Sequence, residues 1–263
     1  MRERSFSAPW WLVISGQCSP WLNMGLDLVF WQNVRTGKSP PVLRFYSWQP
    51  PSVSLGYKQK AERLINVEFC HCYRIPVVQR PTGGSALFHD LELTYSFTAR
   101  KDDYPAFSGP VSSYLTICHA LQRGLKKLGL SVEVRGFSDT VEPSFARQSC
   151  FNLSSRHDLV ILGRKLVGSA QRRDKESFLQ HGSLLLGLRK NLWEKIFLEP
   201  VNFEKVATVA DFLSPCPEEK KIISCLLAGF QEIFHRKFSL TEPAKEEIQQ
   251  AWHLAQTHCQ PLI

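Results

Sequence analysis

Residues 80–98 read RPTGGSALFHDLELTYSFT and contain both a strand pattern and a turn whose residues could bind a ligand. The second half, residues 92–98, alternates polar and apolar side chains and predicts a β-strand with two different faces. The first half contains the Thr82-Gly83-Gly84 turn, whose backbone N–H groups are free of large side chains, so a carbonyl or phosphate oxygen can approach closely. The turn is not a P-loop, because the G-x-x-x-x-G-K spacing is absent.

Two charged or titratable residues flank this turn. Arg80 can fix an anionic group, and His89 can form a pocket wall or transfer a proton. A plainer interpretation is a tight turn between two strands, with His89 satisfied by backbone groups. The residues alone leave both interpretations open.

Along the whole chain, the apolar patterns predict a mixture of strands and helices. Strands are expected at residues 10–16, 42–48, 52–56, 92–98, 132–134, 158–162 and 177–186, and helices at 21–34, 59–72, 111–128 and from about 190 to the end. Because they do not follow strict βαβ alternation, an α+β fold is favoured over a doubly wound parallel sheet.

Composition narrows the class of protein. With 43% hydrophobic and 21% charged residues, the 263-residue chain is neither disordered, collagen-like nor a coiled coil. Its net charge of +8 favours an acidic partner, which composition alone leaves as nucleic acid, a membrane surface or an acidic protein. The apolar run at residues 10–14 is too short for a signal peptide, and no run could span a bilayer, so a cytoplasmic protein is expected.

A second stretch, residues 158–171, reads DLVILGRKLVGSAQ and predicts a hairpin. Lys165 follows the turn and precedes Gly168, Ser169 and Ala170, whose small side chains leave the backbone accessible. A lysine there can reach a ligand oxygen, and its charge would stabilise a nearby thiolate. An ordinary solvated lysine on a surface hairpin is the alternative.

A third stretch, QHGS at residues 180–183, lies inside an otherwise apolar strand. Gly182 weakens packing there and is typical of a strand that a ligand approaches closely.

One of the eight cysteines lies in a distinctive setting. Cys150 lies in the polar stretch ARQSCFNLSS, residues 146–155, with Arg147, Arg156 and Lys165 close in sequence. A loop thiolate with a cationic activator suits covalent catalysis. An idle thiol is the plainer interpretation.

Other cysteines in the chain do not suggest a nucleophile. Cys70-His71-Cys72 has C-x-C spacing with no second ligand pair, so a zinc site is disfavoured. Cys118 and Cys225 lie on apolar helical runs and are expected in the core.

Together these stretches resemble the biotin/lipoate A/B ligase and transferase superfamily. Within it, the HDLELTYS string is similar to the cysteine-dependent octanoyltransferases of the M type, and Cys150 lies where that group carries its acyl-thioester nucleophile. The resemblance runs from about residue 10 to 190 and rests on residues 23–27, 46–56, 80–96, 149–151, 158–171 and 179–185.

The resemblance implies a fold like the catalytic domain of class II synthetases and biotin ligase, in which a mixed sheet is backed by helices. We expect a single domain over residues 1–263, with a biotin/lipoate ligase-type catalytic core at 35–240. A helical C-terminal tail, residues 190–263, is expected to pack on this core.

The implied activity is transfer of an octanoyl group from acyl carrier protein to a lysine of a lipoyl-accepting protein, either a glycine-cleavage H protein or the lipoyl domain of a 2-oxoacid dehydrogenase. Cys150 would hold the octanoyl group as a thioester, and Lys165 would lower the pKa of Cys150 and hydrogen-bond the acyl carbonyl. Because a thioester donor is already activated, neither ATP nor a metal is expected. The implied substrate-binding residues are Arg80, Thr82, Gly83, Gly84, His89, Gly168, Ser169, Ala170, His181 and Gly182.

Two positions depart from the family pattern. Gln79 stands where family members often have a second arginine, and Ser85 replaces the third glycine common in the ligases. Both changes fit a weaker demand for nucleotide phosphate and favour a transferase.

Three alternatives remain at this point. An ATP-dependent lipoate-protein ligase would form an acyl-adenylate, whereas an amidotransferase that moves octanoyl between lipoyl-accepting proteins would also use Cys150. A nucleic-acid binder is disfavoured, because the basic residues are scattered and form no known motif.

Overall fold

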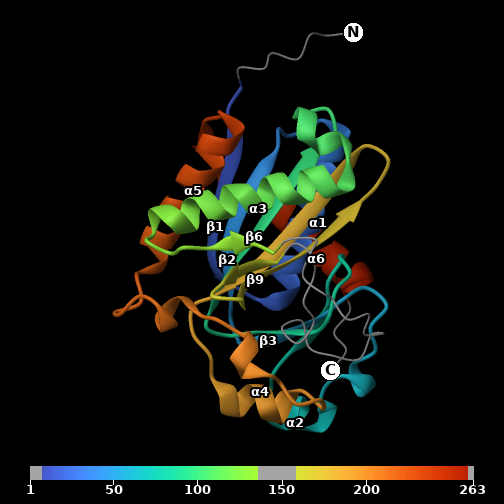
Figure 1. The fold of residues 1–263 in the computed structure, drawn as a ribbon. Helices are drawn as coiled ribbons and strands as arrows, with labels where there is room; N and C mark the ends of the chain where they lie inside the picture. Colours follow the sequence, from blue (N-terminus) through green and yellow to red (C-terminus); the bar gives the residue numbers. More distant parts are fainter. Residues whose placement is uncertain (1–7, 136–157, 260–263) are drawn as a thin grey trace.

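A large mixed sheet lies at the centre of this computed structural model, which describes residues 8–135 and 158–259 (Figure 1). The strand order is β11-β1-β2-β6-β10-β9-β8-β7; β1 is parallel to β2 and β11, and the other pairs are antiparallel. The strands are β1 (Trp10–Cys18), β2 (Val42–Trp48), β6 (Glu92–Arg100), β7 (Glu133–Val134), β8 (Leu159–Ile161), β9 (Arg164–Arg173), β10 (Ser177–Leu185) and β11 (Phe238–Leu240).

Helices cover both faces of this sheet (Figure 1). One face carries α1 (Pro20–Thr36) and α6 (Lys245–His258), and the other carries α3 (Pro110–Lys127) and α5 (Glu219–Phe234). Short 3₁₀ turns occupy Pro105–Ser108, Phe203–Lys205 and Val209–Asp211. The α+β class with a mixed sheet backed by helices is therefore confirmed.

A small sheet lies beside the large one, with the strand order β4-β3-β5. It consists of β3 (Ser52–Leu55), β4 (Val77–Gln79) and β5 (Leu87–His89), and its core also takes in α2 (Val67–Cys72) and α4 (Lys190–Ile196). The helix predicted over residues 59–72 is wrong in its first half, where a 3₁₀ turn at Ala61–Arg63 stands apart from α2. The side chain of Asn66 accepts a hydrogen bond from the Phe69 N–H at 2.9 Å and so begins the helix at residue 67.

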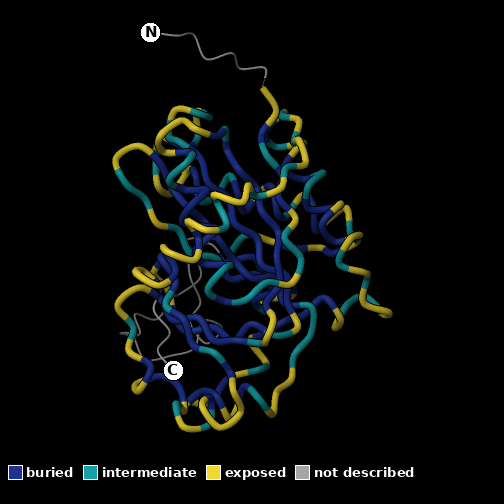
Figure 2. The backbone as a smooth tube through the Cα atoms, turned by 180° about the vertical axis from the view of Figure 1, so that it is seen from behind, coloured by how far each residue is buried: buried dark blue, intermediate teal, exposed yellow. Residues whose placement is uncertain are grey.

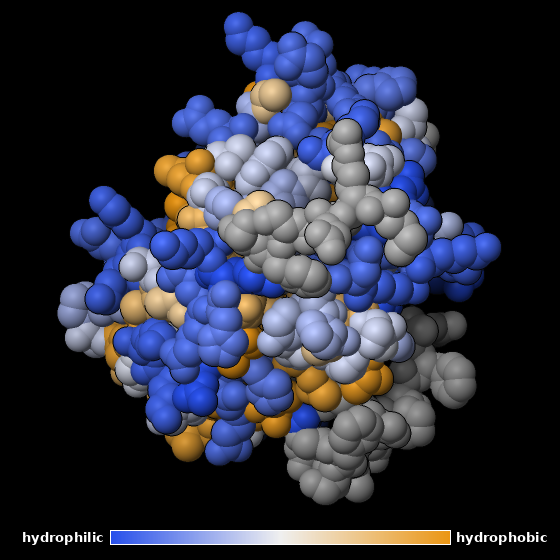
Figure 3. Space-filling model, turned by 90° about the horizontal axis from the view of Figure 1, so that it is seen from above, coloured by the Kyte–Doolittle hydropathy of each residue, from blue (hydrophilic) through white to orange (hydrophobic). Residues whose placement is uncertain are grey.

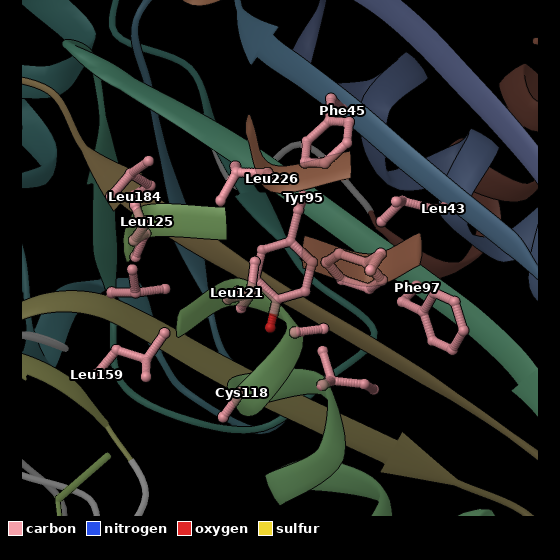
Figure 4. Close-up of a cluster of buried hydrophobic side chains, with 14 of the residues drawn as sticks. Leu43, Phe45, Tyr95, Phe97, Cys118, Leu121, Leu125, Leu159, Leu184 and Leu226 are labelled. Carbon is pink, nitrogen blue, oxygen red and sulfur yellow. The ribbon is translucent and has the colours of Figure 1, made fainter. Parts of the chain in front are cut away.

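The alternation in β2 and β6 divides the interior into an apolar and a polar face. Leu43, Phe45, Tyr95 and Phe97 point into the cluster formed with α3 and α5 (Figure 4). Because neighbouring strand residues point to opposite sides, the intervening polar residues of these strands face α1 instead. Figure 2 shows that these central strands are buried along most of their length, so the polar side chains are enclosed as well.

The C-terminal region departs from the predicted run of helices. His235 ends α5 with a φ of 51°, and the chain then forms β11, in which Phe238 pairs with Trp10 of β1. The indole of Trp10 also packs edge-on against the Phe238 ring at 5.8 Å. A short apolar strand is hard to recognise between two helices, because three residues are too few to show a period.

The surface is largely hydrophilic on the face shown in Figure 3, with apolar residues in separate groups. No helix in the described part of the chain is both long and apolar enough to cross a membrane.

Candidate active site

A narrow pocket lies between the polar face of the large sheet and the small sheet. A water-sized sphere can reach about 30 Å³ within it, which is room for only a few water molecules. The pocket is lined by Met24, Tyr46, Trp48, Ser54, Arg80, Leu87, His89, Thr94, Gly168, Ser169, Ala170, His181, Gly182 and Ser183.

Most residues expected to bind substrate converge on this pocket. Thr82 donates or accepts a hydrogen bond at the ring of His181, and a Cβ built on Gly84 would come within 3.7 Å of the Ala170 methyl. The predicted residues that line the pocket directly are Arg80, His89, Gly168, Ser169, Ala170, His181 and Gly182. Three segments far apart in the sequence therefore form one wall.

Arg80 holds the Thr-Gly-Gly turn from inside. Its guanidinium donates to the carbonyl oxygens of Ser54 at 3.2 Å, Gly83 at 2.7 Å and Ser85 at 2.8 Å, and to the Ser54 hydroxyl at 3.1 Å. Gly84 adopts a φ of +88°, which a residue with a Cβ rarely does. With these hydrogen bonds Arg80, expected to be able to fix an anion, holds the turn against β3.

A buried carboxylate, Asp27 of α1, organises the polar face behind the pocket. Its Oδ1 accepts from the Arg44 guanidinium at 2.9 Å and from the Ser96 hydroxyl at 2.7 Å. Its Oδ2 accepts from the Tyr46 hydroxyl at 2.8 Å and lies 3.1 Å from Nδ1 of His181. Burial acts to raise the pKa of Asp27, but the His181 hydrogen bond and the Arg44 charge outweigh it, so the pKa lies below its usual value. Asp27 is therefore ionised.

A second buried carboxylate, Glu92 of β6, supports the opposite side of the pocket. It accepts hydrogen bonds from the hydroxyls of Thr94 and Ser183, and it lies 3.6 Å from Nδ1 of His89. The His89 ring stacks on Trp48 at 3.9 Å, and its Nε2 lies 2.8 Å from the Ser54 hydroxyl. Burial lowers the pKa of His89, which Glu92 offsets only in part, so this histidine is neutral near pH 7.

Lys165 lies on β9, three residues before the pocket-lining Gly168, but it is not part of the lining. Its ammonium is 3.0 Å from the carboxylate of Asp158, and both side chains are buried. A register shift between β8 and β9 puts the consecutive residues Leu166 and Val167 into the same core cluster, as a β-bulge does. The bulge thus points Lys165 away from that core, on the same side as Asp158.

The predicted nucleophile, Cys150, lies outside the described residues. The residues that flank its segment meet, because the Arg135 N–H donates to the Asp158 carbonyl at 2.9 Å. The hairpin predicted after Asp158 is confirmed, with its turn at Leu162 and Gly163, both at positive φ.

None of the described cysteines lines the pocket. Cys118 and Cys225 are buried in the core as expected, and burial raises the pKa of Cys118. Burial also raises the pKa of Cys70 to about 11 and that of Cys259 to about 12, so these thiols stay protonated.

The C-x-C segment, Cys70-His71-Cys72, lies at the end of α2. Cys70 is fully buried, whereas Cys72 is exposed, so the two thiols lie in different environments. Within residues 8–135 and 158–259, no three His, Cys, Asp or Glu side chains gather so as to hold a metal ion.

Sequence reasoning missed the two carboxylates that support the histidines. Asp27 interrupts the apolar helix sequence LNMGLDLVF, and a lone charge in such a run is a signal of a paired buried group. Glu92, Thr94 and Ser96 are the polar positions of an alternating strand, which on its own predicts a solvated face.

Comparison with known sequences finds a family model and relatives that match most of this chain. The model of the lipoyl protein ligase A/B catalytic domain matches residues 19–231. Octanoyltransferase LipM of Bacillus subtilis (strain 168) is 34% identical over 265 residues, which cover 94% of each chain. Octanoyltransferase LipM of Carboxydothermus hydrogenoformans is 36% identical over 236 residues, or 86% of each chain.

Solved structures agree on the fold. Lipoate-protein ligase A bound with ATP has a TM-score of 0.79 at 24% identity and covers 95% of both chains. A putative lipoate protein ligase of T. acidophilum with bound lipoic acid has a TM-score of 0.78 at 23% identity, covering 95% of this chain and 96% of its own. With the match to residues 19–231 and relatives of this length and identity, this chain belongs to the lipoyl protein ligase A/B catalytic domain family.

Proposed function

We propose that this chain is an octanoyltransferase of protein lipoylation, which takes octanoyl from acyl carrier protein and delivers it to a lysine of a lipoyl-accepting protein. The observation that carries this proposal is the similarity, over 94% of each chain, to a protein named octanoyltransferase LipM. The acceptor would be a glycine-cleavage H protein or the lipoyl domain of a 2-oxoacid dehydrogenase.

The proposed reaction has two steps. The Cys150 thiolate attacks the carrier thioester, the new S–C bond forms, and the carrier thiolate leaves; the acceptor lysine then attacks the Cys150 thioester, and the Cys150 thiolate leaves. Neither step consumes ATP, because the donor bond is already activated. No described cysteine lines the pocket, which supports the assignment of the nucleophile to Cys150.

The described residues suit the handling of an acyl thioester. Gly168, Ser169 and Ala170 bring small side chains to the pocket wall, and the Thr82-Gly83-Gly84 turn lies next to Ala170. Backbone N–H groups of this turn would stabilise an oxyanion. Lys165 contacts Asp158, which directly follows in sequence the segment that carries Cys150, and its charge would favour the thiolate. The net charge of +8 suits brief electrostatic docking with two acidic partner proteins.

The test is intact-mass analysis of the protein after mixing with octanoyl acyl carrier protein. The wild-type chain should gain about 126 Da at Cys150 and pass it to an apo H protein or lipoyl domain without ATP. Cys150→Ala should form no adduct and transfer nothing; full activity of this variant would contradict the thioester route.

Two further assays distinguish the octanoyltransferase from a lipoate ligase and from an amidotransferase. A lipoate ligase would show ATP-dependent pyrophosphate exchange, which the transferase would not. An amidotransferase would accept octanoyl from an octanoylated lipoyl-accepting protein, and it would be unreactive toward octanoyl acyl carrier protein.

A further inference from the structure

The pocket opens to the surface at β9. All residues of its lining are buried except Ser169 and Ala170, which are partly exposed. Next to the Ala170 methyl lies the Thr-Gly-Gly turn, in which Gly83 and Gly84 are exposed. The mouth of the pocket is therefore bounded by β9 on one side and by this turn on the other.

Arg172 continues this side of β9 beyond the mouth. Alternate residues of a strand share a face, so Arg172 lies on the same side of β9 as Ala170, about 7 Å further along the strand. Its guanidinium lies 5.6 Å from the ring centroid of Trp31 and 5.1 Å from that of Tyr57, and it donates to the Pro81 carbonyl at 3.0 Å. These contacts hold the cation in place, so little side-chain entropy is lost when an anion binds to it.

Two further residues extend this surface. Tyr57 is 53% exposed, and its backbone N–H donates to the Thr82 carbonyl at 2.8 Å, which joins it to the turn. The ammonium of Lys58 lies 5.7 Å from the centroid of the Tyr57 ring. Tyr57, Lys58 and Arg172 thus form one exposed group beside the mouth, which we call the rim cluster.

Both cations of the rim cluster can receive an anion. Lys58 and Arg172 are exposed, and no carboxylate in the described part of the chain forms an ion pair with either. Arg35, by contrast, pairs with Asp174. The bond to Pro81 uses one of the five N–H groups of the Arg172 guanidinium, so donors remain for a carboxylate.

The composition of the rim cluster is typical of a protein–protein contact. Tyr and Arg are both enriched where proteins meet, because each combines a large contact area with a polar group. Two cations around an exposed aromatic ring are complementary to an acidic protein surface.

The short reach of a lysine favours the acceptor protein over acyl carrier protein as the occupant. An octanoyl group in this pocket is joined to a protein, so its carbonyl carbon lies at the mouth. The acceptor lysine extends only about 6 Å from its own backbone, so the acceptor must cover the rim cluster when it reacts. Acyl carrier protein presents its thioester on a phosphopantetheine arm, which is far longer and keeps the carrier further from the mouth.

We propose that the rim cluster is the docking surface for the acidic lipoyl-accepting protein. Carboxylates near the acceptor lysine bind Arg172 and Lys58, and the Tyr57 ring packs against the acceptor between them. This inference rests on the proposed function, and it assigns to these residues a part in the second step of the reaction alone.

The two steps are therefore measured separately. Each variant is loaded with octanoyl acyl carrier protein, and the loaded form is then mixed with increasing concentrations of an apo lipoyl domain, with transfer followed by intact mass. We expect Arg172→Glu to load at close to the wild-type rate and to lower the second-order rate constant of transfer about tenfold or more at low ionic strength. Added salt should narrow this difference, because it screens the repulsion between the introduced carboxylate and the acceptor.

Lys126→Glu is the matched control, since it changes the net charge by the same amount. Lys126 is exposed and lies about 18 Å further along α3 than Tyr114, whose hydroxyl donates to the Ser169 carbonyl. This variant should load and transfer at close to the wild-type rates. A loss of transfer equal to that of Arg172→Glu would assign the effect to net charge and contradict a local docking surface.

Three other outcomes would overturn the proposal. They are normal transfer by Arg172→Glu, a loss of loading alone, which would assign the surface to the carrier, and an equal loss of both steps, which a merely structural role predicts. Should Arg172→Glu melt early, Lys58→Glu serves instead and should slow transfer without slowing loading. Failure of the wild-type chain to load at all would instead contradict the proposed function.

Discussion

The ammonium of Lys165 and the carboxylate of Asp158 form a buried ion pair with an N–O distance of 3.0 Å. The two side chains are 5% and 1% exposed, so removing either one leaves the other charged in a dry environment. Lys165→Met is expected to lower the free energy of unfolding by about 3 kcal/mol, measured by urea denaturation.

The double variant Lys165→Met/Asp158→Leu separates this effect from catalysis. It replaces both charges with apolar groups and should regain most of the lost stability. If Lys165 acts on the thiolate or the acyl carbonyl, the double variant will be folded but deficient in loading. A folded double variant with normal loading would remove Lys165 from the reaction.

The buried, neutral state of His89 predicts a loss of stability at mildly acidic pH. Its pKa in the folded protein lies below the usual 6.5, so between these two values the unfolded chain binds a proton that the folded chain does not. The free energy of unfolding should therefore fall as the pH decreases below about 6.5, by at most about 1.4 kcal/mol per pH unit. His89→Gln, which can still bond Ser54, should show a shallower dependence between about pH 7 and 5.5; an unchanged slope would assign the loss to other groups.

Gly83 and Gly84 are neighbours in sequence, but alanine should be tolerated at Gly83 and destabilising at Gly84. A Cβ on Gly83 meets no atom within 4 Å, so Gly83→Ala should change stability by less than about 0.5 kcal/mol. Gly84 has a φ of +88°, and its Cβ would lie 2.8 Å from the Arg80 guanidinium, so Gly84→Ala should cost about 1 kcal/mol or more. Thermal denaturation of the two variants tests this contrast, and equal costs would contradict the backbone geometry of the turn.

Docking of acidic partners predicts a dependence on salt. Raising the ionic strength from about 0.05 to 0.5 M should increase the KM for octanoyl acyl carrier protein several-fold, because screening weakens attraction between exposed charges. Loading from a small uncharged octanoyl thioester is the control and should change little. A KM for the carrier protein that does not respond to salt would leave the charge of +8 without this role.

The architecture follows from local patterns to a large extent, since the alternation of residues 92–98 and the apolar period of residues 111–128 predict β6 and α3. From local patterns alone the site was predictable only as separate stretches, which the family resemblance joined, because the contacts between Thr82 and His181, or between Asp27 and Arg44, join residues that no local pattern relates. In a sheet with one face exposed to solvent, the polar residues of an alternating strand point into the solvent. Here α1 covers that face, so the polar residues are buried. Burial of Glu92 and Ser96 thus depends on a tertiary contact that alternation does not encode.

The large sheet ends at β7 on one side and at β11 on the other, strands of only two and three residues. The central strands β2, β6 and β10, which could act as templates for another chain, are each paired along both sides over much of their length. Edge strands this short offer few free N–H and C=O groups for pairing between molecules. Deleting the chain from residue 237 onward would remove the strand that pairs with the first three residues of β1, and such a truncated protein should be prone to aggregation even where its pocket is intact.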